Sequence, residues 1–350
     1  MKSAYPGACA CLLAMACLPL NALAGVDASA ASAPRVAPAQ VQTASAAQTA
    51  DAVQMLDKAI ALVREHAYHV DRIDWVRTES RLRAMVRAGA PPADAYPAIR
   101  ALLEALGDGH SFLMPAATAA MRSDTGTRAV TVASPPTLVL VLRGETGFVA
   151  MPGFTAADPA AQQAFAAGIG NAIAAAAAQT RCGWVVDLRD DTGGNMWPML
   201  AALRPLLGNG VLGTMRPRDG SNLPWSASGM PLADAQRWPD LTQVPVAVLQ
   251  GPRTSSAGEA VAVAFRGRTA TRSLGLPSDG RVSANMSLQL PDGSMLAIAS
   301  AYYRDRNGQL YLQALQPDQR VAVDPGAIDS TVGQAQAWLA TQGRCAGGGR

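Results

Sequence analysis

One stretch of the sequence limits the kind of fold this chain can adopt: the switch from strand to helix within residues 244–267. Val244–Leu249 is a short, apolar, β-branched run bounded by glycine and proline, which predicts a buried strand. From Ala257, small and apolar helix formers continue to Gly267, which predicts a buried helix. A buried strand that leads into a buried helix is typical of an α/β fold, and such folds commonly carry their chemistry in the loop after the strand.

Ser256 lies at this switch and has two interpretations. Residues 256–259 match S-x-x-E ahead of an apolar run, the signature of a capping box in which Ser256 and Glu259 satisfy the first N–H groups of the helix. The functional interpretation is a nucleophile, because a helix N-terminus offers unpaired N–H groups and partial positive charge to an oxyanion. The motif alone favours the capping box, so the choice depends on residues elsewhere in the chain.

Composition restricts the classes of partner. The chain has 350 residues, 49% of them hydrophobic, which is enough for one large domain and a smaller one. A formal net charge of +3 is too weak to indicate nucleic acid or an anionic membrane surface as a partner. The chain contains neither a phosphate-binding loop nor a complete metal-ligand pattern, so we predict no cofactor and no metal.

The N-terminus resembles an export signal. Lys2 supplies the positive end, residues 8–20 are apolar, and residues 22–24 form an A-x-A cleavage site, so residues 1–24 are interpreted as a signal peptide. Residues 25–50 are small and polar, which predicts a disordered leader. The apolar stretch is too short to span a bilayer. We therefore expect a periplasmic or secreted protein with no stable membrane insertion.

Two cysteines, Cys182 and Cys345, remain after removal of the signal. They either form a disulfide that ties the C-terminal tail to the start of a core strand or remain free thiols. Export to an oxidising compartment favours the disulfide.

Hydrophobic patterning predicts two folded regions. Apolar residues that recur at three- and four-residue steps predict an N-terminal helical bundle over residues 51–115. A main domain is expected over residues 120–340, in which the Gly-, Pro- and Asp-rich segment 208–243 is interpreted as an irregular flap. The expected elements are helices at about 51–67, 72–88 and 92–106, a hairpin at 137–154, helices from Asp158 to about 180 and at 197–207, strands at 183–188, 269–275, 285–290 and 294–302, and a closing helix at 331–341.

Two glycine-rich turns hold further candidate residues. His110 follows Asp108 and Gly109 on a tight turn, where a functional histidine and an ordinary polar loop are about equally expected. Gly193 and Gly194 follow the strand at 183–188. They either end that strand or bring a backbone N–H close to a substrate carbonyl.

Four segments in this order resemble the C-terminal-processing (tail-specific) serine peptidase family. They are LGDGHSFL at 106–113, VVDLRDDTGGNMWPML at 185–200, VLQGPRTSSAGE at 248–259 and LQPDQRVAVDP at 315–325. The resemblance covers residues 51–340 and implies a crotonase-like or ClpP-like αβ core that hydrolyses peptide bonds with a serine nucleophile. The interval between His110 and the expected hairpin is too short for a PDZ-like segment.

The resemblance assigns roles to residues of this chain. The family's S-x-x-E serine corresponds to Ser256, and the tail-processing branch places its lysine base 25 residues later, where this chain has Arg281. Arginine stays protonated and cannot act as that base, which excludes a Ser–Lys dyad. The branch with tricorn core protease and nisin resistance protein instead takes its base from a DGH-type turn, which corresponds to His110.

The remaining implied parts are the oxyanion hole and the group that orients the histidine. The resemblance implies an oxyanion hole formed by the N–H groups of Ala257 and of Gly194 or Gly193. Where tricorn has an orienting glutamate, this chain has Gln313 and Gln316, so either a dyad suffices or another group such as Asp305 orients His110. The sequence thus predicts an exported serine endopeptidase that acts on a peptide or protein. The alternative is a catalytically degenerate peptide- or ligand-binding protein on the same fold.

Overall fold

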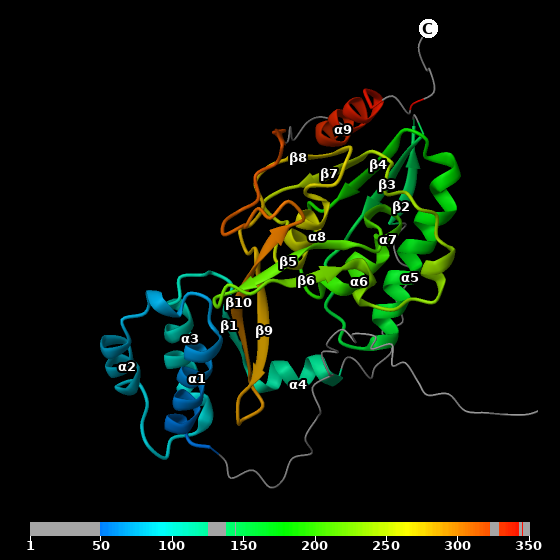
Figure 1. Ribbon diagram of the computed structural model, residues 1–350. Coiled ribbons are helices and arrows are strands. Elements are labelled where there is room, and N and C mark those ends of the chain that lie inside the picture. The colour runs from blue at the N-terminus through cyan, green and yellow to red at the C-terminus, as the bar shows by residue number, and fades with distance from the viewer. Residues whose placement is uncertain (1–49, 125–137, 144, 323–328, 343–344, 346–350) are drawn as a thin grey trace, which may run out of the picture. The chain divides into compact units, whose positions relative to one another are not determined.

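A six-stranded sheet forms the centre of the α/β fold (Figure 1). Its strands lie in the order β11 (Gln319–Arg320), β8 (Thr271–Gly275), β7 (Val246–Gln250), β4 (Gly183–Asp187), β3 (Thr146–Ala150) and β2 (Val139–Leu142). All run parallel except β2, which pairs antiparallel with β3. The computed structural model describes residues 50–124, 138–143, 145–322, 329–342 and 345, so the expected signal peptide and the leader up to residue 49 lie outside these ranges.

Helices cover both faces of this sheet, which explains why its central strands are apolar without alternation. On one face, Trp184 and Val186 of β4 belong to the main hydrophobic core, together with α5 (Pro159–Ala176), α6 (Met196–Ala202), α7 (Arg204–Leu207) and α8 (Ala257–Phe265). On the other face, Val185 packs in a smaller cluster with Ala335 and Leu339 of α9 (Ser330–Ala340). Alternate residues of one strand therefore contact different layers.

A second, five-stranded sheet contains β1 (Phe112–Met114), β10 (Met295–Asp305), β5 (Val211–Pro217) and β6 (Leu223–Ser226), with β9 (Ser283–Gln289) also paired to β10. The pairs β1–β10, β10–β5, β10–β9 and β5–β6 are all antiparallel. This sheet holds the segment that precedes α4 (Ala116–Asp124) next to strands from the C-terminal half of the chain.

The N-terminal helices bury their apolar faces against the second sheet. Helices α1 (Ala52–His66), α2 (Trp75–Arg83) and α3 (Tyr96–Glu104) share a hydrophobic cluster with Leu296 and Ile298 of β10. Asp51 caps α1 with a capping box that includes Gln54. Short 3₁₀ turns at Val70–Arg72, Pro92–Ala95, Ala177–Gln179, Ala227–Gly229 and Asp234–Arg237 complete the described elements. Within the described ranges, no helix combines the length and apolarity needed to cross a membrane.

A disulfide joins Cys182 to Cys345, 163 residues apart. It links the residue before β4 to the chain that follows α9. A cross-link that closes so long a loop restricts the unfolded chain, and such bonds typically stabilise a protein by about 2–4 kcal/mol.

The structure differs from the sequence-based expectations in several places. Residues 208–243 are irregular only in part, since they include β5 and β6. The helix expected at 72–88 is shorter and preceded by a 3₁₀ turn, and the helix expected at 197–207 is divided into α6 and α7. Proline at position 205 explains the division, because it lacks an N–H and fits only the first turn of a new helix.

Candidate active site

Ser256 joins β7 to α8 in an unusual backbone conformation. Its φ of 54° and ψ of −112° lie in a region that non-glycine residues rarely adopt. Such strain costs of order 1–3 kcal/mol and persists only where the surroundings enforce it. Here Gly193 packs so closely that a Cβ at that position would lie 2.8 Å from Ser256 Cβ. The turn therefore holds the Ser256 side chain in a fixed direction at the edge of the sheet.

The glutamate of the S-x-x-E motif does more than cap the helix. Glu259 is fully buried, and its Oε2 accepts a hydrogen bond from the Ser256 N–H at 2.9 Å. Ser256 and Glu259 have the arrangement of a capping box at the start of α8. Oε1 of Glu259 instead accepts from the Ser278 hydroxyl and the Gly280 N–H, at 2.5 and 2.8 Å. Glu259 thus anchors the loop at 278–280 to the serine turn.

His110 is presented by the turn between α3 and β1. Asp108 Oδ1 accepts hydrogen bonds from the N–H groups of His110 and Ser111 at 2.9 and 2.8 Å. Gly107 and Gly109 adopt positive φ angles of 62° and 63°, which glycine tolerates without steric cost. Asn285 of β9 donates to the His110 carbonyl at 3.0 Å. These bonds fix the histidine backbone on both sides.

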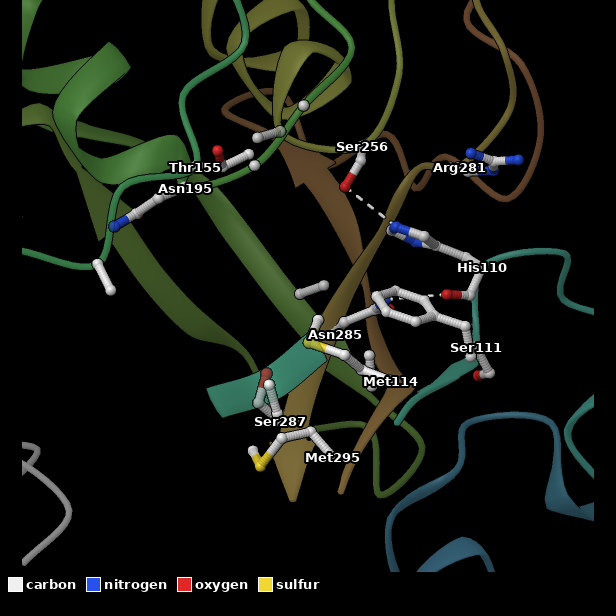
Figure 2. A pocket seen from close by; sticks show the side chains of 18 of the residues that line it. His110, Ser111, Met114, Thr155, Asn195, Ser256, Arg281, Asn285, Ser287 and Met295 are labelled. Carbon is white, nitrogen blue, oxygen red and sulfur yellow. Dashed lines mark hydrogen bonds between the residues drawn. The ribbon is translucent and has the colours of Figure 1, made fainter. Parts of the chain in front are cut away.

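The imidazole of His110 lies between two serine hydroxyls. Its Nε2 is 3.0 Å from Ser256 Oγ and its Nδ1 is 2.7 Å from Ser283 Oγ, as Figure 2 shows for the first contact. A neutral imidazole that donates from Nδ1 to Ser283 leaves Nε2 free to accept the Ser256 proton. The arrangement is that of a nucleophile, a base and a group that orients the base.

Burial governs the protonation of this histidine. The side chain is 8% exposed, and desolvation followed by the positive charge of Arg281 lowers the pKa of His110 to about 4, although Asp108 and Asp279 act in the opposite direction. The imidazole is therefore neutral at neutral pH, which is the protonation state that a general base requires.

The candidate oxyanion donors are not equivalent. The Gly193 N–H donates to Asp191 Oδ1 at 3.0 Å, so the suggestion that Gly193 serves as a donor is a poor one. The N–H groups of Gly194 and Ala257 have no hydrogen-bond partner among the described residues. Gly194 and Ala257, which both line the same cleft as Ser256, therefore remain as the two candidate donors.

A cleft of about 1580 Å³ opens in front of His110 and Ser256. Small-molecule sites usually measure roughly 300–1,000 Å³, so this cleft is larger than a typical small-molecule site. Figure 2 shows Met114, Asn285, Ser287 and Met295 along the cleft, away from Arg281. In the described part of the chain, Arg281 and Asp292 are the only Asp, Glu, Lys or Arg residues that line the cleft.

Sequence reasoning missed Ser283, and Asp305, its candidate for the group that orients His110, is bound elsewhere. The Asp305 carboxylate accepts from the N–H groups of Asn307 and Gln309 and from the Tyr311 hydroxyl. Neither Gln313 nor Gln316 is hydrogen-bonded to His110. Ser283 had no sequence signal, since a serine that starts a strand is common. No group of three or more His, Cys, Asp or Glu suited to a metal occurs in the described ranges.

The chain is similar to several known proteins. The sequence model of Peptidase family S41 matches residues 145–321, half of the chain. The nisin-resistance protein of Lactococcus lactis subsp. lactis is 27% identical over 263 residues, which cover 72% of this chain and 78% of that protein. A lipoprotein from Streptococcus agalactiae has a similar structure, with a TM-score of 0.71 and 20% identity over 84% of this chain and 97% of that one. The photosystem II D1 C-terminal processing protease has a TM-score of 0.56 and 14% identity over 84% of this chain and 98% of that one.

Proposed function

Because the chain belongs to peptidase family S41, we propose that it is an exported serine peptidase with Ser256 as nucleophile and His110 as general base. The observation that carries the proposal is the 3.0 Å contact between His110 Nε2 and Ser256 Oγ at the head of a large cleft. A nucleophile within hydrogen-bond reach of a neutral, oriented base is the arrangement that acyl transfer needs.

The proposed reaction has two halves. Ser256 Oγ attacks the carbonyl carbon of a peptide bond while His110 Nε2 takes the hydroxyl proton, and the N–H groups of Gly194 and Ala257 bind the tetrahedral oxyanion. The C–N bond then breaks, and His110 gives its proton to the leaving amine. Water, deprotonated by the same imidazole, attacks the acyl-enzyme and releases the acid product with Ser256 restored.

The direct test is cleavage of a varied peptide panel by the purified protein, with products identified by mass spectrometry. The proposal predicts cleavage that requires Ser256. A protein that binds peptides saturably but cleaves none, with binding unchanged in Ser256→Ala, would instead be the catalytically degenerate binder.

We expect the orientation of the His110 imidazole, and with it the turnover rate, to depend on the hydrogen bond to Ser283. Replacement of Ser283 by alanine removes the Nδ1 partner, and a hydrogen bond of this kind contributes about 1–1.5 kcal/mol. Turnover should therefore fall about tenfold with a nearly unchanged KM. Steady-state kinetics of the Ser283→Ala variant beside Ser300→Ala, a serine of β10 outside the cleft lining, checks this. Full activity of Ser283→Ala would show that the imidazole needs no Nδ1 partner.

The pH dependence of kcat/KM follows from the low pKa of His110. Because the imidazole is neutral above a pKa of about 4, activity should persist well below pH 6.5 and decline only near pH 4. Replacement of Arg281 by glutamine removes a charge that lowers this pKa, so the acidic limb should move to higher pH. An acidic limb near pH 6.5 in the wild type, or no movement in the variant, would contradict this assignment.

Export and the disulfide can be tested on the same material. Protein isolated from the extracytoplasmic fraction should begin at Gly25, after the A-x-A site. It should show no free thiol until reduction, and then two, from Cys182 and Cys345. A chain that still begins at Met1, or that reacts with thiol reagents before reduction, would contradict the respective proposal.

A further inference from the structure

Asp191 is a fully buried carboxyl group that the proposed reaction does not use. It lies in the loop after β4, between the strand that ends at Asp187 and the glycine pair. Its side chain binds the glycine loop, since Oδ1 accepts the Gly193 N–H at 3.0 Å. Its backbone binds the serine turn, since the Asp191 carbonyl accepts the Ser255 N–H at 3.0 Å. One residue therefore connects the two segments that face the reacting carbonyl.

Asp191 is closely packed against the start of α8, so its position is fixed. A Cβ at position 258 would lie 2.5 Å from the Asp191 carbonyl oxygen and 2.9 Å from its Cγ, so only glycine fits there at the start of α8. The Asp191 N–H is also engaged, with the Leu188 carbonyl at 3.0 Å. The Asp191 carboxyl group thus packs tightly against the first turn of α8.

The charged side chains near Asp191 in sequence and on α8 pair with groups other than the Asp191 carboxyl. Arg189 pairs with Asp187 and Asp329, and Arg253 pairs with Asp190. On α8, the Glu259 carboxylate is used by the serine turn and the loop at 278–280. Burial raises the pKa of Asp191 to about 7, although the Gly193 N–H opposes the shift, and Oδ2 has no partner among the described residues. In either protonation state a carboxyl oxygen can still accept the Gly193 N–H.

We propose that Asp191 is a positioning residue for peptide hydrolysis, which locks the loop that carries Gly194 to the turn that carries Ser256. Because Asp191 occupies the Gly193 N–H, the Gly194 N–H is the one left for the oxyanion. The inference depends on the proposed function, because the oxyanion is that of the proposed reaction. Asp191 acts only through Gly193 and Ser255.

The kinetic test compares two substitutions of Asp191. Asp191→Leu keeps the approximate size of the side chain but removes the oxygen that accepts the Gly193 N–H. Asp191→Asn keeps a side-chain oxygen that can accept this N–H but has no proton to lose. Loss of one oxyanion donor costs about 10²–10³ in kcat. A glycine loop that is less firmly held should place the Gly194 N–H less accurately, so the kcat of Asp191→Leu should fall about 10–100-fold while its KM stays within about threefold of wild type. Asp191→Asn should stay within about fivefold of wild type. Asp190→Ala, which changes an adjacent, exposed carboxylate, is the matched control and should leave the rate unchanged.

Three kinetic outcomes would overturn the proposal: a kcat of Asp191→Leu within threefold of wild type, an equal loss in both Asp191 variants, or an effect on KM alone. A readout without turnover separates this inference from the proposed function. In the Ser256→Ala background, NMR should show a Gly193 amide that exchanges slowly in the parent and in Asp191→Asn, and at least tenfold faster in Asp191→Leu. Equal exchange in all three proteins would refute the lock even if the protein is a peptidase. If Asp191→Leu does not fold, the steady-state kinetics and the Gly193 amide exchange are measured on Asp191→Ala instead. The same fold-changes then support or overturn the proposal.

Discussion

Replacement of Ser256 by alanine is expected to lower peptide hydrolysis by at least four orders of magnitude. No other described hydroxyl lies within hydrogen-bond distance of His110 Nε2. The variant therefore loses the nucleophile itself, and no second hydroxyl can replace it. Alanine carries the same backbone strain at φ 54° as serine, so the variant should keep the fold and lose only about 1 kcal/mol of stability with the capping hydroxyl. Mass-spectrometric rate measurements on a peptide that the wild type cleaves will measure the loss.

The neighbouring serine provides the matched control for this prediction. Ser255 donates to the Asp279 carboxylate at 2.6 Å and is not hydrogen-bonded to the imidazole. Ser255→Ala should therefore lose less than tenfold in rate, and the melting temperatures of both variants should be compared with that of wild type. Equal hydrolysis by wild type and Ser256→Ala would refute the proposed nucleophile.

The second large effect is expected at His110. Replacement by glutamine retains a polar side chain but supplies no base, so turnover should fall by about three to four orders of magnitude. Since the two residues act as a unit, the double variant with Ser256→Ala should be no slower than Ser256→Ala alone. Single-turnover kinetics of the two single variants and the double variant will measure the coupling.

His69 is the control for the loss of an imidazole. It is hydrogen-bonded through Nε2 to the Tyr302 hydroxyl at 3.0 Å and does not line the cleft. The rate of His69→Gln should stay within about threefold of wild type. Additive losses in the Ser256 and His110 double variant would contradict a shared proton transfer.

Much of the local structure could be predicted from the sequence because short-range rules govern it. The run from β7 into α8, the Asp158 cap of α5 and the hairpin of β2 and β3 each follow from residues a few positions apart. The second sheet was harder to predict. Strands β5 and β6 lie in a Gly- and Pro-rich segment, and β5 owes its other pairing to β10, about 90 residues later in the chain.

By itself, the sequence determined which side chains have chemistry to offer: a serine at a strand-to-helix switch, a histidine on a glycine turn and two glycines after a buried strand. The tertiary structure alone decided which of them meet. His110 and Ser256 are 146 residues apart in sequence, and His110 and Ser283 are 173 apart. The choice between Gly193 and Gly194 depended on Asp191, whose neighbours across the fold no local pattern reveals. The physical reason is that capping and strand formation depend on adjacent residues, whereas a proton transfer or an oxyanion hole needs atoms placed to within a few tenths of an ångström by the packing of the whole core.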